Sequence, residues 1–230
     1  MNLGNKNYKI TALLPMKGHS ERIPDKNMKL FGNKPLYHFV MSSLLASQYI
    51  EKVIVNTDSE IISDDVNRNF EQVKIHWRPE KIRGDYVSMN EIIAFDLKQL
   101  EEEHFFQTHC TNPLLRPEII DKAIQRYFDN LDQFDSLFSV TKLQTRLYWK
   151  NGTAINHNPS ELLRTQDLPP VYEENSNFYI FSKDSFNNCG NNRIGLTPQM
   201  FEIDKIEAVD IDNPHDFIIA ENLYNFLSNG

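Results

Sequence analysis

Short apolar runs alternate with amphipathic stretches through the first 130 residues of the chain. Strands are predicted at 8–14, 52–57, 73–77 and 105–109, because each is a short apolar run bounded by proline, aspartate or other polar residues. Strands that alternate with helices in this way are typical of βαβ units around a mainly parallel sheet. The pattern therefore predicts an α/β protein.

Three helices are predicted from apolar residues that recur at helical spacing. The first covers 36–44 and the second 89–100, where Ser88 and Glu91 form a capping-box pattern at its start. The third begins at Pro117 and runs towards Leu131, because proline is tolerated in the first turn of a helix. These helices would cover the faces of the predicted sheet.

The pattern changes from about residue 136, where strand-like runs are separated by Asn-Gly and Pro-Pro turns. We interpret the segment at about 141–180 as a small antiparallel arm that projects from the sheet and makes dimer contacts. A last strand is predicted at 207–212, followed by a helix capped by Asn213. Without a repeat or flexible linker, residues 1–230 are predicted to form a single domain.

The composition narrows the range of partners. The chain has 24 Lys and Arg against 32 Asp and Glu, a net charge of −8, which argues against broad binding to nucleic acid or to an anionic membrane. No stretch approaches the roughly 20 apolar residues of a membrane span, and no secretory run precedes the first strand, so we predict a cytoplasmic protein. Cys110 and Cys189 lie outside any CxxC or Cys/His cluster, which favours reduced, inert thiols.

The loop LLPMKGHSERIPDKN connects the first strand to the first helix. It therefore lies at the carboxyl edge of the sheet, where open α/β proteins bind ligands. Gly18 leaves backbone N–H groups free to face a phosphate, and Lys17, Arg22 and Lys26 supply positive charge. The loop is neither a Walker loop nor a GxGxxG motif, so a merely solvated basic loop is the alternative.

Asp210 and Asp212 are two residues apart in the predicted last strand, so both side chains leave the same face while Ile211 points into the core. Two such carboxylates could share a magnesium ion, which prefers oxygen ligands and commonly joins one or two carboxylates to substrate phosphates. The alternative is that the Asp-x-Asp pattern only caps the following helix and faces solvent.

The first loop resembles the first motif of the acylneuraminate cytidylyltransferase family, which reads as a strand, Pro-Ala-Arg-Gly-Gly-Ser-Lys-Arg-Ile-Pro and a Lys-Asn pair. Further segments resemble that family in the same order across nearly the whole chain, and the ordered set carries the resemblance. They are LFGNKPLYHFV, VIVNTDSEII, RPEKIRGDYVSMNEII, HCTNPLLRP, RTQDLPPVYEENSNFYIF and VDIDNPHDFIIAE.

The resemblance implies a Rossmann-like nucleotide-diphospho-sugar transferase fold and a homodimer whose arms cover the neighbouring site. It implies transfer of CMP from CTP to the anomeric hydroxyl of an acidic 2-keto sugar of the sialic acid type, with release of pyrophosphate. Magnesium would be the cofactor, and CTP and the keto sugar the small-molecule substrates. The product would enter surface polysaccharide or glycoprotein synthesis.

The resemblance also implies roles for individual residues. Catalysis falls to Lys26, Lys17, Asp210 and Asp212, of which the two aspartates hold the metal. The sugar side comprises His109, Arg164, Gln166 and Glu173, where an arginine suits a carboxylate because its fork binds both oxygens. The nucleotide-binding set comprises Leu14, Pro15, Met16, Lys17, Gly18, Arg22, Lys26, Arg78 and Asp85.

Three positions depart from the usual family pattern. Lys17 and Glu173 stand where the family usually has arginine, and His109 stands where many members have glutamine. The changes near the sugar leave an eight-carbon keto acid, or a diamino nonulosonate such as legionaminic or pseudaminic acid, as alternative acceptors. Another nucleotide with a sugar 1-phosphate, and a catalytically weak nucleotide-sensing or scaffold protein, are further alternatives.

Overall fold

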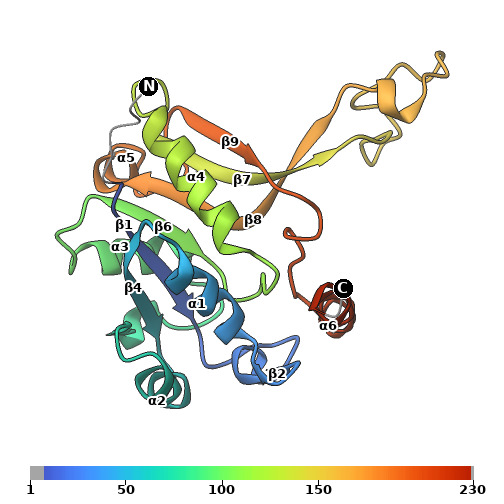
Figure 1. Ribbon diagram of the computed structural model, residues 1–230. Helices are drawn as coiled ribbons and strands as arrows, with labels where there is room; N and C mark the ends of the chain where they lie inside the picture. The colour runs from blue at the N-terminus through green and yellow to red at the C-terminus, as the bar shows by residue number, and fades with distance from the viewer. Residues whose placement is uncertain (1–7, 229–230) are drawn as a thin grey trace, which may run out of the picture.

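The computed structural model describes residues 8–228, in which a seven-stranded sheet lies between two layers of helices (Figure 1). The strand order is β5-β4-β1-β6-β8-β7-β9. β8 is antiparallel to both of its neighbours, and the other pairs of neighbouring strands in this sheet are parallel. The predicted mainly parallel α/β fold is therefore confirmed. The strands are β1 (Ile10–Met16), β4 (Ile50–Thr57), β5 (Lys74–Trp77), β6 (His104–Thr108), β7 (Ser136–Leu143), β8 (Val171–Ser182) and β9 (Pro198–Glu202), with a separate pair β2 (Leu30–Phe31) and β3 (Lys34–Pro35).

Helices α1, α2 and α4 pack on one face of the sheet, and α3 and α5 pack on the other. None of the described helices has the length and apolar character needed to cross a membrane. The α-helices are α1 (Tyr37–Ala46), α2 (Glu60–Asn69), α3 (Met89–Leu97), α4 (Pro117–Asp129), α5 (Lys183–Asn188) and α6 (Pro214–Ser228), and short 3-10 turns occur at Lys26–Met28, Glu80–Ile82 and Thr165–Asp167.

The starts of three helices follow from their local sequence, as predicted. The Ser88 hydroxyl accepts from the Glu91 N–H at 3.2 Å and the Glu91 carboxylate accepts from the Ser88 N–H at 3.0 Å, so the capping box of α3 is complete. Pro117 occupies the first turn of α4. The side-chain oxygen of Asn213 accepts from the N–H groups of His215 and Asp216, which caps α6.

The order of the strands places an open crevice at one edge of the sheet. β1 pairs with β4 on one side and with β6 on the other, so the chain reverses its winding direction between β1 and β6. At such a switch point the loops after the two strands diverge, and ligands of open α/β proteins bind between them. The loop that follows β1 and the loop that follows β6 are therefore the parts of the fold that position a site.

An arm formed by residues 144–170 projects from the far ends of β7 and β8 (Figure 1). The two strands pair in antiparallel fashion, and the predicted Asn-Gly turn lies at the tip of a hairpin in which Gly152 has φ +84°. The pairing of β7 with β8 shifts register between Phe138 and Val140, opposite Ser176, which has φ +55°. This bulge bends β8 where it leaves the sheet for the arm.

The strand predicted at 207–212 does not form. The backbone there makes a turn, with the Ala208 N–H donating to the Asp204 carbonyl at 2.9 Å, and then runs past the end of β6, where the Ile211 N–H donates to the Thr111 carbonyl at 2.9 Å. Side-chain amides bind the carbonyls that a neighbouring strand would have bound: Asn177 donates to Glu207 and Asn112 donates to Val209. The predicted alternation still holds, because Ile211 is buried between two partly exposed aspartates.

Candidate active site

A pocket of about 270 Å³ lies at the switch point between β1 and β6. Its walls come from the loops that follow β1, β5 and β6 and from the first turns of α3, which are far apart in the sequence. Eight residues that the sequence predicts at the site line it: Pro15, Met16, Lys17, Arg22, Lys26, Arg78, Asp85 and His109.

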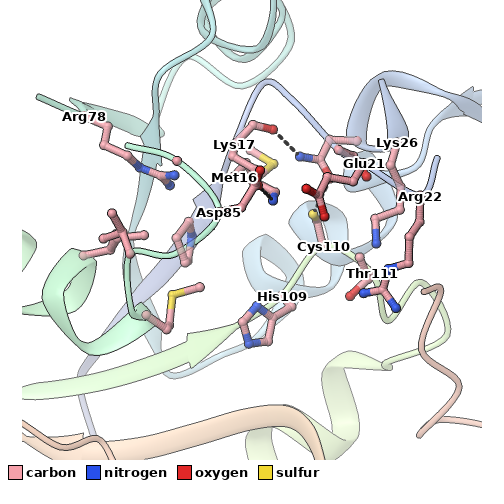
Figure 2. Close-up of a pocket in the computed structure, with 17 residues that line it drawn as sticks. Met16, Lys17, Glu21, Arg22, Lys26, Arg78, Asp85, His109, Cys110 and Thr111 are labelled. Carbon is pink, nitrogen blue, oxygen red and sulfur yellow. Dashed lines mark hydrogen bonds and ion pairs between the residues drawn. The ribbon is translucent and has the colours of Figure 1, made fainter. Parts of the chain in front are cut away.

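The pocket gathers positive charge in an otherwise acidic protein. Figure 2 shows Arg22 and Lys26 close to Thr111 on one side, Arg78 on the opposite side, and His109 below them. Four cations line the pocket against two carboxylates, those of Glu21 and Asp85. A concave site with this excess of positive charge suits a polyphosphate, because the low-dielectric walls strengthen the attraction.

The cationic loop meets the segment that carries the two predicted metal ligands. The Lys26 ammonium donates to the carbonyl of Ile211 at 2.7 Å, and the Arg22 guanidinium forms an ion pair with Asp212 at 2.8 Å. Residues separated by about 190 positions therefore form one surface beside the pocket. A site that binds both a phosphate and a metal ion requires the lysine to lie near the two aspartates, and Lys26 contacts the residue between them.

Asp210 and Asp212 fit a magnesium ion in their donor chemistry. The Oδ1 atom of Asp210 is buried and has no hydrogen-bond partner among the described residues, which leaves an oxygen ready for a cation. Burial raises the pKa of Asp210, and the charge of Asp212 adds to this effect, whereas Thr111 and Lys26 oppose it. Within residues 8–228 no group of three or more His, Cys, Asp and Glu converges on a point. Two carboxylates suit magnesium, which takes its other ligands from water and phosphate.

Lys17 forms an ion pair with Asp85 across the mouth of the pocket at 2.5 Å. The hydrogen bond from the ammonium lowers the pKa of the Asp85 carboxyl. Both side chains are exposed to solvent, so the pair contributes little to stability. A phosphate group can therefore replace Asp85 as the partner of Lys17 at little cost.

Asn27 is a functional residue that the sequence prediction missed. Its side-chain amide donates to the carbonyl of Lys17 at 3.0 Å, and its carbonyl oxygen accepts from the Cys110 thiol at 2.9 Å. The residue thus joins the loops that follow β1 and β6. The signal for it was the Lys-Asn pair in the first motif. Burial raises the pKa of Cys110 to about 12, which is in line with the inert thiol expected here.

Leu14 and Gly18, both predicted in the nucleotide-binding set, do not line the pocket. Leu14 is fully buried in the core beneath the sheet edge. The N–H of Gly18 donates to the Asp58 carboxylate at 2.7 Å, and a Cβ at this position would lie 2.9 Å from the Cβ of Ser59. Glycine is therefore needed here for the close approach of the loop to the end of β4, and its part in the site is to shape the loop.

Arg78 is buried and held by a network of polar side chains. Its Nε donates to the Asn56 side-chain oxygen at 2.7 Å, and a terminal nitrogen donates to the Asn56 carbonyl at 3.0 Å. The Asn56 amide in turn donates to the Asp96 carboxylate at 2.8 Å, which also binds His76 at 2.8 Å. Burial lowers the pKa of Arg78, while the charges of Asp58 and Asp96 oppose the shift. The guanidinium is thus fixed at the pocket wall by β4, β5 and α3.

His109 is the pocket residue whose pKa is lowered furthest. Burial lowers the pKa of its imidazole from 6.5 to about 3, and the positive charges of Arg193 and Lys26 add to the effect. The ring is therefore neutral at physiological pH and acts as a hydrogen-bonding group rather than as a cation. It keeps the hydrogen-bonding character of the glutamine that is common at this position.

The amino-acid sequence matches the family described as cytidylyltransferase over residues 11–229. The chain belongs to this cytidylyltransferase family. Two solved structures share the fold of this cytidylyltransferase, each at 13% sequence identity. One is a CMP:2-keto-3-deoxy-manno-octonic acid synthetase complexed with CTP, with a TM-score of 0.70 over 95% of this chain and 99% of that one. The other is a 4-diphosphocytidyl-2C-methyl-D-erythritol synthase from Anaerococcus prevotii, with a TM-score of 0.69 over 95% of this chain and 97% of that one. The predicted nucleotidyltransferase fold is confirmed.

Curated relatives of the cytidylyltransferase use several sugars, according to their names. A pseudaminic acid cytidylyltransferase from Campylobacter jejuni is 26% identical over 74% of this chain and 76% of that protein. N-acylneuraminate cytidylyltransferase A from Danio rerio is 29% identical over 94% of this chain but only 51% of that protein, so this chain spans about half of its length. A CMP-N,N'-diacetyllegionaminic acid synthase from Legionella pneumophila is 26% identical over 94% and 96%.

The residues predicted on the sugar side of the cytidylyltransferase are not gathered in the pocket. Arg164 and Gln166 lie in the arm, where Arg164 is exposed and pairs with Asp167 at 2.6 Å. Glu173 lines a second cavity of about 480 Å³, which it shares with Asp210. Of the predicted sugar-side residues, only His109 lines the pocket.

Proposed function

We propose that this cytidylyltransferase transfers CMP from CTP to the anomeric hydroxyl of an acidic 2-keto sugar of the sialic acid type and releases pyrophosphate. The observation that carries the proposal is the meeting of Lys26 and Arg22 with the Asp210–Asp212 segment beside one pocket. This arrangement joins a polyphosphate site to a pair of carboxylates suited to a divalent cation. The names of the relatives support the same reaction class.

CTP would bind along the loop that follows β1. The backbone at 15–17 faces the pocket and can read the edge of the cytosine, while Arg78 contacts the nucleotide from the opposite wall. Lys17, Arg22 and Lys26 would bind the phosphates, because all three are cations of the pocket lining. Lys17 keeps the charge of the arginine usual in the family and binds as a point charge.

Magnesium would be held by Asp210 and Asp212. Bound there, it would supply positive charge against the phosphate oxygens of CTP and the leaving pyrophosphate. Asp212 would exchange the guanidinium of Arg22 for the metal, which frees Arg22 for a phosphate oxygen. The exposed ion pair is weak, so this exchange costs little free energy.

The reaction is a single in-line displacement. The anomeric oxygen of the keto sugar forms a bond to the α-phosphorus of CTP as the bond from that phosphorus to the oxygen shared with the β-phosphorus breaks. That oxygen leaves as a terminal oxygen of pyrophosphate, and the hydroxyl proton is released to solvent. Catalysis rests on positioning the two substrates and on the cations Lys26 and Lys17, which stabilise the charge on the phosphate oxygens. Cys110 takes no part, since its thiol is buried and protonated.

The acceptor is proposed to be a nine-carbon keto acid. The relatives are named for pseudaminic, N-acylneuraminic and diacetyllegionaminic acids, which are nine-carbon keto acids. Glu173 in place of the usual arginine favours an acceptor other than ordinary N-acetylneuraminate. The eight-carbon keto acid remains an alternative for the same site. Glu173 can accept hydrogen bonds from hydroxyl or amide N–H groups, which diamino sugars offer in greater number.

The arm supports the proposal of a homodimer. Trp149 and Leu162 are large apolar residues of the arm that are 63% and 95% exposed in the single chain. Arg164 and Gln166 lie on the same arm, so a partner's site is where they would reach a sugar. Each protomer would then complete the sugar side of its neighbour. The cytoplasmic location and the absence of a nucleic-acid partner stay predictions from the sequence.

The experiment that tests the function is a pyrophosphate-release assay in magnesium. CTP, UTP, GTP and ATP are each combined with N-acetylneuraminate, a diamino nine-carbon keto acid, an eight-carbon keto acid and a sugar 1-phosphate. We expect release with CTP and a free keto acid only, and the most active acid identifies the acceptor. Release with a sugar 1-phosphate and none with any keto acid would contradict the proposal.

A further inference from the structure

Besides Arg22 and Arg78, which line the pocket, a further arginine, Arg193, lies behind it and has no role in the nucleotide site. Arg193 belongs to the loop between α5 and β9, and one of its terminal nitrogens donates to the side-chain oxygen of Gln107 at 2.7 Å. The centre of its guanidinium lies 3.7 Å from the centroid of the Tyr179 ring, a cation–π contact. Neighbouring strands β6 and β8 thus fix the plane of the guanidinium.

The charge of Arg193 is not paired with a carboxylate. Among residues 8–228, none of the ion pairs includes it. The charge of Glu174 acts on Arg193, but this carboxylate accepts a hydrogen bond from the Tyr179 hydroxyl. Burial lowers the pKa of Arg193, which reflects the cost of a partly desolvated cation without a counter-ion. A ligand oxygen would relieve this cost.

Arg193 does not line the pocket, but Gln107 connects it to the pocket residue His109. Its partner Gln107 and the pocket residue His109 are two apart on one face of the sheet edge, and their side chains approach to 3.4 Å. The charge of Arg193 acts directly on the His109 ring. Arg22 and Lys26 lie away from His109 in Figure 2, beside Thr111. A sugar that extends from the phosphates past His109 would therefore meet Arg193.

We propose that Arg193 is a specificity-determining residue that binds an oxygen of the acceptor sugar. The carboxylate is the first candidate because it is the one charged group of a 2-keto acid, and a carbonyl oxygen of an acyl substituent is the second source of the same chemistry. A guanidinium fork held in place by Gln107 and Tyr179 suits either oxygen. This inference rests on the proposed function, since it assigns the recognition of the sugar.

The test is steady-state kinetics of Arg193→Gln with CTP and the best keto acid found for the wild type. We expect the KM for the keto acid to rise at least tenfold while the KM for CTP stays within about twofold, because the lost contacts concern the sugar alone. Arg193→Lys keeps the charge without the fork and should raise the KM less. Arg126→Gln, at an exposed arginine of α4, is the matched control and should behave as wild type.

Analogues of the keto acid distinguish the two oxygens. If Arg193→Gln loses its KM effect when the carboxylate is replaced by a neutral carboxamide, the carboxylate is the ligand; if it loses the effect with a de-acylated sugar, the acyl carbonyl is. An unchanged KM for the keto acid, or equal rises for CTP and the sugar, would overturn the assignment. A wild-type enzyme that releases no pyrophosphate from CTP and a keto acid would instead refute the proposed function, which keeps the two failures apart.

Discussion

At the scale of single residues, two of the cations proposed to bind phosphate form ion pairs with nearby carboxylates. Lys17 pairs with Asp85, and Arg22 pairs with Asp212. Both pairs are exposed to solvent, so each contributes little to stability. They keep the cations oriented towards the pocket but yield readily to a phosphate or a metal ion, whose charges are larger. The site is thus arranged for exchange of partners rather than for permanent ion pairs.

Replacing Asp212 with Asn should nearly abolish turnover and leave the fold intact. The side chain is 49% exposed, so its change disturbs no core packing, but it removes one of the two proposed metal ligands and the partner of Arg22. Pyrophosphate release at saturating CTP and magnesium measures the effect, and thermal unfolding checks the fold. Glu202→Gln, at an exposed carboxylate on β9, is the control. Near-normal activity of the Asp212 variant would show that the metal assignment is wrong.

The neutral His109 ring predicts a pH dependence of stability. Its pKa is about 3 in the folded protein against 6.5 ordinarily, so between these values the unfolded chain binds a proton that the folded chain does not. The free energy of unfolding should therefore fall as the pH is lowered from about 6.5 towards 3, and the contribution is fully present above 6.5.

His109→Gln tests this contribution because glutamine does not titrate. Urea unfolding at pH 8, 6 and 5 should show a shallower loss of stability in the variant than in the wild type, although His104, whose pKa burial also lowers, retains its own contribution in both. Parallel curves for the two proteins would mean that His109 titrates normally in the fold.

At the scale of secondary-structure elements, the nucleotide-facing wall depends on a buried network across β4, β5 and α3. Asp96 is 2% exposed and binds both Asn56 and His76, and Asn56 holds Arg78. A carboxylate on α3 thus positions a guanidinium at the pocket without touching it. The register of β4 against β5, in which Asn56 faces His76, brings the partners together.

Asp96→Asn should raise the KM for CTP several-fold with a smaller change in kcat. The amide oxygen can still accept from Asn56 and His76, but the substitution removes the negative charge that strengthens both hydrogen bonds and that acts on Arg78. The protein should therefore lose roughly 1–3 kcal/mol of stability and Arg78 its fixed orientation. The assay is run well below the melting temperature, with Asp64→Asn on the exposed side of α2 as control. A variant with lower stability but the wild-type KM for CTP would show that Arg78 needs no such support.

At the scale of the whole molecule, the arm exposes apolar surface that the compact part of the chain does not cover. It carries Tyr148, Trp149 and Leu162, whose exposed fractions are 51%, 63% and 95%. Surface of this kind on a projecting element is typical of an interface between subunits. The bulge at Ser176 sets the direction in which the arm leaves the sheet, and so the direction of the proposed contact.

Trp149→Glu combined with Leu162→Glu should convert the proposed dimer into a monomer and raise the KM for the keto sugar more than that for CTP, because the arm supplies Arg164 and Gln166 to the neighbouring site. Light scattering after gel filtration measures the mass. Leu196→Glu, 71% exposed but outside the arm, is the control. A wild-type protein that is monomeric at assay concentration would contradict the role of the arm.

The sequence by itself determined the class of fold, most of the helices and strands, the cationic loop at the sheet edge and the family. These features depend on local patterns: hydrophobic periodicity, the capping box at Ser88, the helix cap at Asn213, and a loop whose charges lie within ten residues. The alternation of partly exposed Asp210, buried Ile211 and partly exposed Asp212 was also a local pattern. It is present although the strand predicted there did not form, because burial of one side chain fixes the orientation of its neighbours in any extended backbone.

Only the tertiary structure decided which distant residues meet. The contacts of Asn27 with Cys110 and of Arg193 with Gln107 join positions more than 80 residues apart, and the network behind Arg78 depends on the packing of α3 against the sheet. No local pattern encodes such pairs, because strand order and register set them. The lost strand has the same cause: side-chain amides of Asn112 and Asn177 take the carbonyls of 207–209, and their position is fixed by β6 and β8.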